Sequence, residues 1–262
     1  MNAPARSGPL LEAAGVTKLY GDTVGCRDVD FSLFPGEVLG VVGESGSGKT
    51  TLLNCLSAQL KPTSGAVRFD TRTQGLTDIF GLSEPERRML MRTDWGIVHQ
   101  NPRDGLRMAV SAGGNVGERL MAVGARHYGR IRGEALAWLD KVEIDTGRVD
   151  DLPRTFSGGM QQRLQIARIL VSKPRLVFMD EPTGGLDVSV QARLLDLLRG
   201  LVRDLRVAAV VVTHDLAVVR LLADRLMVMK DGYVVEAGLT DQVLDDPQHP
   251  YTQLLVSSVL QV

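Results

Sequence analysis

The chain has 262 residues, 44% of them hydrophobic, which is enough to bury a core in one large domain or in one domain with an inserted subdomain. Thirty basic against 31 acidic residues give a net charge of −1, so no overall field favours nucleic acid or an anionic membrane. Cys26 and Cys55 are too few for a disulfide framework and lack metal-ligand spacing, which fits a reducing cytoplasm. We expect no signal peptide, because residues 1–9 have no apolar core. We also expect no membrane insertion, because the most apolar stretch, residues 207–212, is far shorter than the ~18 residues of a span.

Two strands are predicted ahead of the first motif. Residues 10–19 and 29–33 have strand character, and Pro35-Gly36 turns the chain into the apolar residues 38–42. An antiparallel β layer therefore precedes the motif. Tyr20 ends the first strand, where its ring could stack on an adenine or could simply pack on the surface. The spacing does not decide between the two.

Residues 43–50 satisfy the phosphate-loop pattern G-x-x-x-x-G-K-[ST] directly after that apolar stretch. A helix is predicted to follow from Thr51, so the N–H groups of the loop and of the helix N-terminus would converge on a polyphosphate. Lys49 would meet the β- and γ-phosphates, and the Thr50 hydroxyl would bind a bridging Mg²⁺ ion. The residues assigned to nucleotide binding in this segment are Gly43, Ser45, Gly46, Ser47, Gly48, Lys49, Thr50 and Thr51.

The region after this helix carries weaker signals. Residues 70–82 are polar and predicted to be loop, and Ser83 and Glu86 form a capping box that opens a short helix. A strand over residues 95–99 then delivers Gln100. A glutamine at a strand end could reach the metal or the attacking water, or it could be an ordinary polar loop residue.

Residues 101–155 have few strand signals and two helical patterns, roughly 116–123 and 131–142, which predicts an inserted helical subdomain. Its arginines are most simply a solvated helix face; they are Arg103, Arg107, Arg119, Arg126, Arg130 and Arg132. Ser157-Gly158-Gly159 then precedes a strong helix over residues 161–171. Because nothing bulky covers the N–H groups there, this start can form a second anion site, and a plain serine cap is the alternative.

Two later strands end in polar residues. Residues 176–181 form an apolar run, typical of a buried parallel strand, that ends in Asp180 and Glu181. After a phosphate loop, we expect Asp180 to hold Mg²⁺ and Glu181 to polarise the water that attacks the γ-phosphate. Residues 207–213 deliver His214 to the same edge, where it could bond the γ-phosphate or simply pack. The closing hairpin leads to a tail, residues 240–262, which would pack on the body or on a partner.

In this order the residues resemble the ATP-binding cassette (ABC) ATPases over almost the whole chain. The resemblance implies ATP and Mg²⁺ as cofactors and a head-to-tail homodimer, in which the signature motif of one copy closes over ATP held by the other. The roles it implies are adenine stacking by Tyr20, Walker A for residues 43–50, catalysis by Glu181, His214 and Gln100, metal binding by Thr50, Gln100 and Asp180, and cross-dimer nucleotide contacts from Ser157, Gly158, Gly159 and Asp187.

The chain departs from the family pattern in two places. Phe156 and Met160 flank the signature where leucine and glutamine are usual, and Gly184-Gly185 stands where the D-loop usually reads Ser-Ala. Both departures concern the coupling of dimer closure to hydrolysis.

Several segments are similar to the subfamily of cassette ATPases that serves bacterial carbon–phosphorus lyase systems in phosphonate breakdown: residues 99–102, 104–107, 110–115, 117–122, 124–129, 156–166 and 182–187. That similarity implies a soluble partner, the lyase core subunits, received by residues around 101–132, and allows a second ABC ATPase of the same system. The tail motif His249-Pro250-Tyr251-Thr252 is similar to peptide-importer ATPases. The alternative is therefore the ATP-binding subunit of a peptide or phosphonate importer.

The predicted fold is α/β, a P-loop NTPase of the ABC type with a RecA-like core, an N-terminal antiparallel β layer and an inserted helical subdomain. We predict a single domain over residues 1–262. The core and β layer would occupy residues 1–100 and 166–238, the helical subdomain with the signature 101–165, and the tail 239–262.

Overall fold

The computed structural model describes residues 8–259 and contains a four-stranded antiparallel sheet in the order β2-β1-β4-β5. Its strands are β1 Leu11–Tyr20, β2 Thr23–Leu33, β4 Ser64–Thr71 and β5 Gly75–Asp78. Leu11 lies opposite both Leu33 and Phe69, so this apolar row faces the core. The prediction that residues 70–82 are loop is wrong at Asp70 and Thr71, which end β4, and at residues 75–78, which form β5. The polar sequence of β5 forms a short edge strand that pairs only with β4.

The second sheet has six strands in the order β10-β9-β3-β8-β7-β6. Its strands are β3 Val38–Val42, β6 Trp95–Val98, β7 Leu176–Asp180, β8 Ala208–Thr213, β9 Arg225–Lys230 and β10 Tyr233–Leu239. All neighbours are parallel except β9 and β10, which form the predicted hairpin. The strands β3 and β8 are buried along their whole length, as expected for parallel strands covered on both faces.

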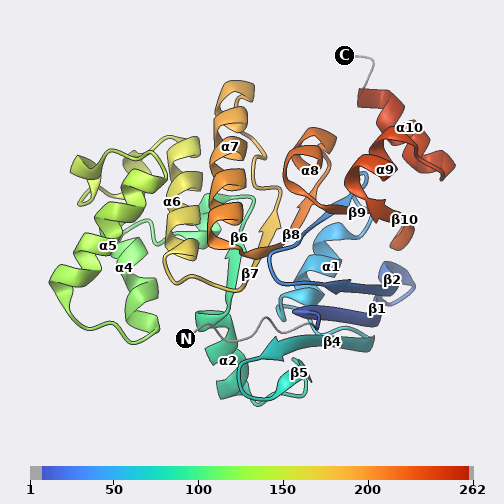
Figure 1. Ribbon diagram of the computed structural model, residues 1–262, viewed down its shortest axis with the longest axis horizontal. Coiled ribbons are helices and arrows are strands. Elements are labelled where there is room, and N and C mark those ends of the chain that lie inside the picture. The colour runs from blue at the N-terminus through green and yellow to red at the C-terminus, as the bar shows by residue number, and fades with distance from the viewer. Residues whose placement is uncertain (1–7, 260–262) are drawn as a thin grey trace.

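Helices cover both faces of this sheet (Figure 1). They are α1 Lys49–Leu56, α2 Glu84–Thr93, α3 Pro102–Gly105, α4 Ala112–Ala122, α5 Tyr128–Lys141, α6 Gly158–Leu170, α7 Val188–Leu205, α8 Leu216–Leu222, α9 Thr240–Asp245 and α10 Pro250–Val259, with 3₁₀ turns at Thr146–Arg148 and Pro153–Thr155. The helices α4, α5 and α6 gather on one side, and α1 lies between the two sheets (Figure 1). Trp95 joins the sheets, because its ring meets Phe69 and Phe178 edge-on at 5.3 and 5.5 Å.

Several local predictions can be compared with these elements. The capping box of Ser83 and Glu86 is confirmed, and Asp215 caps α8 as expected by accepting a hydrogen bond from the Ala217 N–H. The helix α6 begins at Gly158, three residues earlier than predicted, and α7 was not predicted. None of the helices between residues 8 and 259 is long and apolar enough to cross a membrane.

Candidate active site

The phosphate loop lies between the end of β3 and the start of α1, and two of its glycines have no room for a side chain. A Cβ on Gly48 would lie 2.0 Å from the carbonyl oxygen of Gly25 in β2, and one on Gly43 would lie 2.2 Å from that of Met229 in β9. Both residues also have positive φ angles, +99° and +152°. Only glycine fits, so the motif spacing reflects close backbone packing between the loop and two strands.

Lys49 is buried within this loop. Its ammonium donates hydrogen bonds to the carbonyl oxygens of Gly43 and Glu44 at 2.8 and 2.7 Å. Burial lowers the pKa of Lys49 below its ordinary value, and the charges of Glu181 and Asp180 only partly offset this. The loop therefore holds a desolvated cation that gains from meeting an anion.

A cavity of 780 Å³ opens in front of the loop and brings together most of the predicted residues. Its lining includes Tyr20, Gly43, Ser45, Gly46, Gly48, Lys49, Thr50, Thr51, Gln100, Asp180, Glu181 and His214. Ser47 is buried and does not line it; its hydroxyl lies 3.4 Å from the ammonium of Lys49. The side chains come from separate parts of the chain and meet because the parallel strands end at one edge of the sheet.

The Thr50 hydroxyl donates a hydrogen bond to Asp180 Oδ1 at 3.4 Å. Burial and the neighbouring charge of Glu181 raise the pKa of Asp180, and the bond from Thr50 opposes this. A hydroxyl and a carboxylate are hard oxygen donors that suit Mg²⁺ when phosphates and water complete the shell. Within residues 8–259 no three His, Cys, Asp or Glu side chains gather as a metal cage.

Glu181 is held in position from several directions. Its carboxylate accepts hydrogen bonds from the Thr213 hydroxyl at 3.0 Å and from the His214 N–H at 3.1 Å, and its Oε1 lies 2.8 Å from His214 Nδ1. Its φ angle of +45° is unusual for a residue with a side chain, and such strain clusters at functional positions. The strained turn sets the carboxylate at the cavity wall beside the histidine.

Tyr20 and Gln100 lie at two edges of the cavity. Tyr20 is 50% exposed at the end of β1, so its ring is available for stacking. Gln100 is exposed after β6, and its amide packs close to Gly184. Both line the cavity, and their roles stay predictions.

The signature residues and Asp187 do not line this cavity. Ser157 caps α6 by accepting a hydrogen bond from the Met160 N–H at 3.3 Å, and Gly158 lies nearest to Leu186. Phe156 and Met160, the two unusual neighbours of the signature, both contact Arg148: its guanidinium stacks 4.4 Å from the Phe156 ring and bonds the Met160 sulfur at 3.6 Å. Both departures from the family pattern therefore contact the same residue, Arg148.

Sequence reasoning missed several residues near the site, among them Thr23, Val24 and Gly25 of the cavity lining. Thr213 holds Glu181, Tyr251 accepts a hydrogen bond from the Glu44 N–H, and Leu255 lines the cavity. A polar residue at the end of an apolar strand could have indicated Thr213, whereas no local signal places α10 against the phosphate loop.

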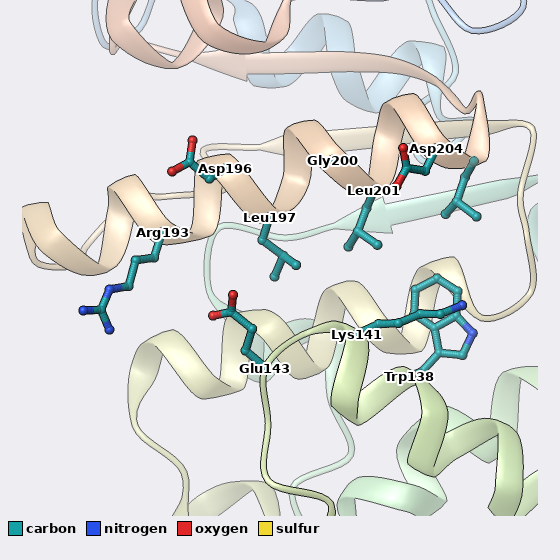
Figure 2. A pocket seen from close by; sticks show the side chains of 10 residues that line it. Trp138, Lys141, Glu143, Arg193, Asp196, Leu197, Gly200, Leu201 and Asp204 are labelled. Carbon is teal, nitrogen blue, oxygen red and sulfur yellow. The ribbon is translucent and has the colours of Figure 1, made fainter.

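A second hollow, of 760 Å³, lies between α5 and α7, where Leu197 and Leu201 face the helical subdomain (Figure 2). It contains none of the predicted site residues.

Comparisons with known proteins agree with this geometry. The model of the ABC transporter family matches residues 26–184. The chain is 68% identical to PhnK of Escherichia coli (strain K12), named as a phosphonates utilization ATP-binding protein, over 97% of this chain and 98% of that one. It is 37% identical to the dipeptide transport ATP-binding protein DppF of the same organism, over 95% of this chain and 76% of that one.

Solved structures show the same fold. The dimeric ATP-binding cassette MJ0796 in a post-hydrolysis state, bound to ADP and Pi, superposes with a TM-score of 0.78 at 31% identity, covering 88% of this chain and 98% of that one. The protein cbiO1 from Clostridium perfringens gives a TM-score of 0.79 at 28% identity, with 92% of each chain covered. With its phosphate loop, its paired carboxylates and these relatives, the chain belongs to the ABC transporter family and is an ATP-hydrolysing ABC ATPase.

Proposed function

We propose that this ATPase acts as a head-to-tail homodimer on Mg-ATP and couples the cycle to the soluble carbon–phosphorus lyase core complex in phosphonate catabolism. The observation that carries the proposal is the 68% identity to a phosphonates utilization protein over nearly the full length of both chains. The peptide-transport relative is only 37% identical. An importer function therefore remains the alternative outcome of the experiments below.

The proposed chemistry follows from the positions of the side chains. The Lys49 ammonium would move from the loop carbonyls to the phosphates, a displacement favoured by the charge of the ligand. Asp180 and Thr50 would hold Mg²⁺, which neutralises phosphate charge when bound. Glu181, oriented by Thr213 and His214, would polarise the attacking water.

The nucleotide site has a direct test in Lys49→Ala. Because the loop loses its cation, we expect ATP affinity to fall at least about 100-fold with the fold retained. Calorimetric titration measures the affinity, and circular dichroism checks the fold. A folded variant that binds ATP like the wild type would contradict the assignment of the phosphate loop.

We infer that the partner binds around residues 101–132. At this surface a Cβ on Gly113 would lie 2.5 Å from the Val149 side chain, and one on Gly114 would lie 2.6 Å from the Val110 side chain, so both glycines allow close packing within the helical subdomain. A hollow of 300 Å³ opens beside this segment; it is lined by arginines from three helices, Arg88, Arg92, Arg119 and Arg168, with Asp104 as its carboxylate. Glu84 pairs with Arg88 at 2.8 Å and Glu118 with Arg168 at 3.2 Å, which leaves a small excess of positive charge that favours an acidic partner surface.

Charge reversal tests this surface. Arg103 is exposed, whereas Arg107 is engaged by Glu118 at 2.9 Å. We expect Arg103→Glu with Arg107→Glu to keep ATP binding but to lose both association with the lyase core and growth on a phosphonate as sole phosphorus source. The matched control, Arg199→Glu with Arg203→Glu on the exposed side of α7, should keep both. Normal pull-down of the core by the first variant would contradict this surface, and loss of uptake rather than breakdown would favour an importer.

A further inference from the structure

The C-terminal helix α10 contacts the phosphate loop directly. The N–H of Glu44, the second residue of the loop, donates a hydrogen bond to Tyr251 Oη at 3.0 Å. One turn further along α10, Leu255 lines the nucleotide cavity. Tyr251 is only 6% exposed and packs in a small core under β3 and β9, so its hydroxyl is presented by a fixed ring.

The segment that carries Tyr251 is fastened to the sheet. The Glu236 carboxylate in β10 accepts hydrogen bonds from the N–H groups of Gln248 and His249 at 2.8 and 3.0 Å. Burial raises the pKa of Glu236, but these bonds outweigh burial and leave the pKa below its ordinary value. The Lys230 ammonium lies 5.0 Å from the centre of the Tyr251 ring. The hydroxyl that meets Glu44 is therefore positioned by β9 and β10.

Glu44 is held at its N–H and at its carbonyl oxygen, and the carbonyl oxygen also accepts a hydrogen bond from the Ser47 N–H at 3.2 Å. Its N–H is bound by Tyr251, and its carbonyl oxygen accepts a bond from Lys49 at 2.7 Å. The proposed role of Lys49 requires its ammonium to leave that carbonyl for the phosphates. Tyr251 then remains as the side-chain anchor of this peptide, and Leu255 continues to close the adjacent cavity wall.

We propose that α10 latches the phosphate loop, with Tyr251 as a positioning residue that keeps the loop in its phosphate-accepting shape while Lys49 changes partners. The latch rests on the proposed nucleotide site. It gives the tail a role in ATP affinity rather than in the chemical step, because Tyr251 touches the loop and not the reacting groups.

Tyr251→Phe in the full-length protein tests the latch, since it removes one hydroxyl and keeps the ring. We expect the KM for ATP to rise about three- to tenfold, the size expected for one hydrogen bond, with kcat within about twofold and Tm lowered by no more than about 2–4 °C. Hydrogen–deuterium exchange of the peptide containing Glu44 should become faster. The matched control is Ser257→Ala on the same helix, whose exposed hydroxyl donates a hydrogen bond to the Leu254 carbonyl oxygen of that helix. It should change neither the KM for ATP nor the exchange rate.

Two adjacent leucines give a second test. Leu255→Ala should raise the KM for ATP, whereas Leu254→Ala, at a side chain 64% exposed, should leave it unchanged. The latch is overturned if Tyr251→Phe leaves both KM and loop exchange at wild-type values, or if it lowers kcat and Tm while KM stays constant. If Lys49→Ala still binds ATP, the assignment of the nucleotide site is wrong. If Lys49→Ala loses ATP binding as expected and Tyr251→Phe has no effect, only the proposed latch is wrong.

Discussion

Two glycine-rich helix starts in this chain look alike in sequence and differ in what surrounds them. The start of α1 has a buried lysine and faces two carboxylates across a large cavity. The start of α6 has exposed Ser157 and Gly158, and its serine caps the helix. A helix N-terminus favours an anion at both places, but only the first has the groups to bind and cleave a polyphosphate within one chain. The start of α6 lacks these groups within one chain, and a second copy of the chain could supply them.

The first prediction tests the completeness of the α1 site and carries the largest expected effect. In Glu181→Gln the amide keeps the shape and loses the charge that polarises water, so kcat should fall about 100- to 1,000-fold while ATP binding persists. Light scattering with Mg-ATP should show the variant accumulating as a dimer. Wild-type turnover by this variant would exclude Glu181 from the role we assign to it.

The second prediction tests whether the site at the start of α6 works only together with a second chain. Ser157→Arg places a bulky cation on an exposed helix start, so turnover should fall about 100-fold while a single chain still binds ATP. Mixed with Lys49→Ala, it forms heterodimers with one composite site whose halves are both intact, and activity should partly return. The matched control is Ser83→Arg, the same change at the exposed serine cap of α2.

Head-to-tail pairing would be contradicted by a mixture that never regains activity or closes under any nucleotide condition. Full activity of Ser157→Arg alone would remove the signature from the mechanism. Loss of activity in Ser83→Arg as well would mean that the effect comes from capping and not from the second site.

The same comparison explains what could be predicted from the sequence. The phosphate loop, Asp180, Glu181 and His214 follow apolar strands, so their shared place at the sheet edge could be derived from chain order and strand polarity. The edge strand β5 is polar, so local composition misled there, and α4 begins at Ala112, ahead of the predicted start near residue 116. Tyr251 meets Glu44 from 207 residues away, a contact that only tertiary packing creates.

The third prediction concerns the cost of burying the Asp180 carboxylate beside the carboxylate of Glu181. Because the pKa of Asp180 is raised above its ordinary value of 3.8, the folded state disfavours its charged form. Asp180→Asn should therefore raise the Tm of the nucleotide-free protein, on the order of 2 °C at neutral pH, while Mg-ATP turnover is lost. The gain should vanish below the ordinary pKa, where both states are protonated, and grow as pH rises through the raised pKa.

Thermal unfolding across pH measures this gain. Asp150→Asn is the opposite control, since the ion pair with Arg132 lowers the pKa of this exposed carboxyl and its loss should not stabilise the protein. A Tm for Asp180→Asn below that of the wild type at neutral pH would show that its bonds outweigh the charge penalty.

The smallest expected effect concerns the loop beside the second helix start. Gly185 has a φ of +74° and open space around its Cα, so Gly185→Ala should lower the free energy of unfolding by about 1 kcal/mol through backbone strain alone. Gly133 also has open space but lies inside α5, so Gly133→Ala should raise that free energy by about 0.5–1 kcal/mol. Denaturant titration gives both values. Neither substitution meets a neighbour. A stabilising Gly185→Ala would therefore show that this loop, next to the signature, is not held in its left-handed conformation in solution. The backbone conformation would then not explain why glycine stands at this position of the D-loop.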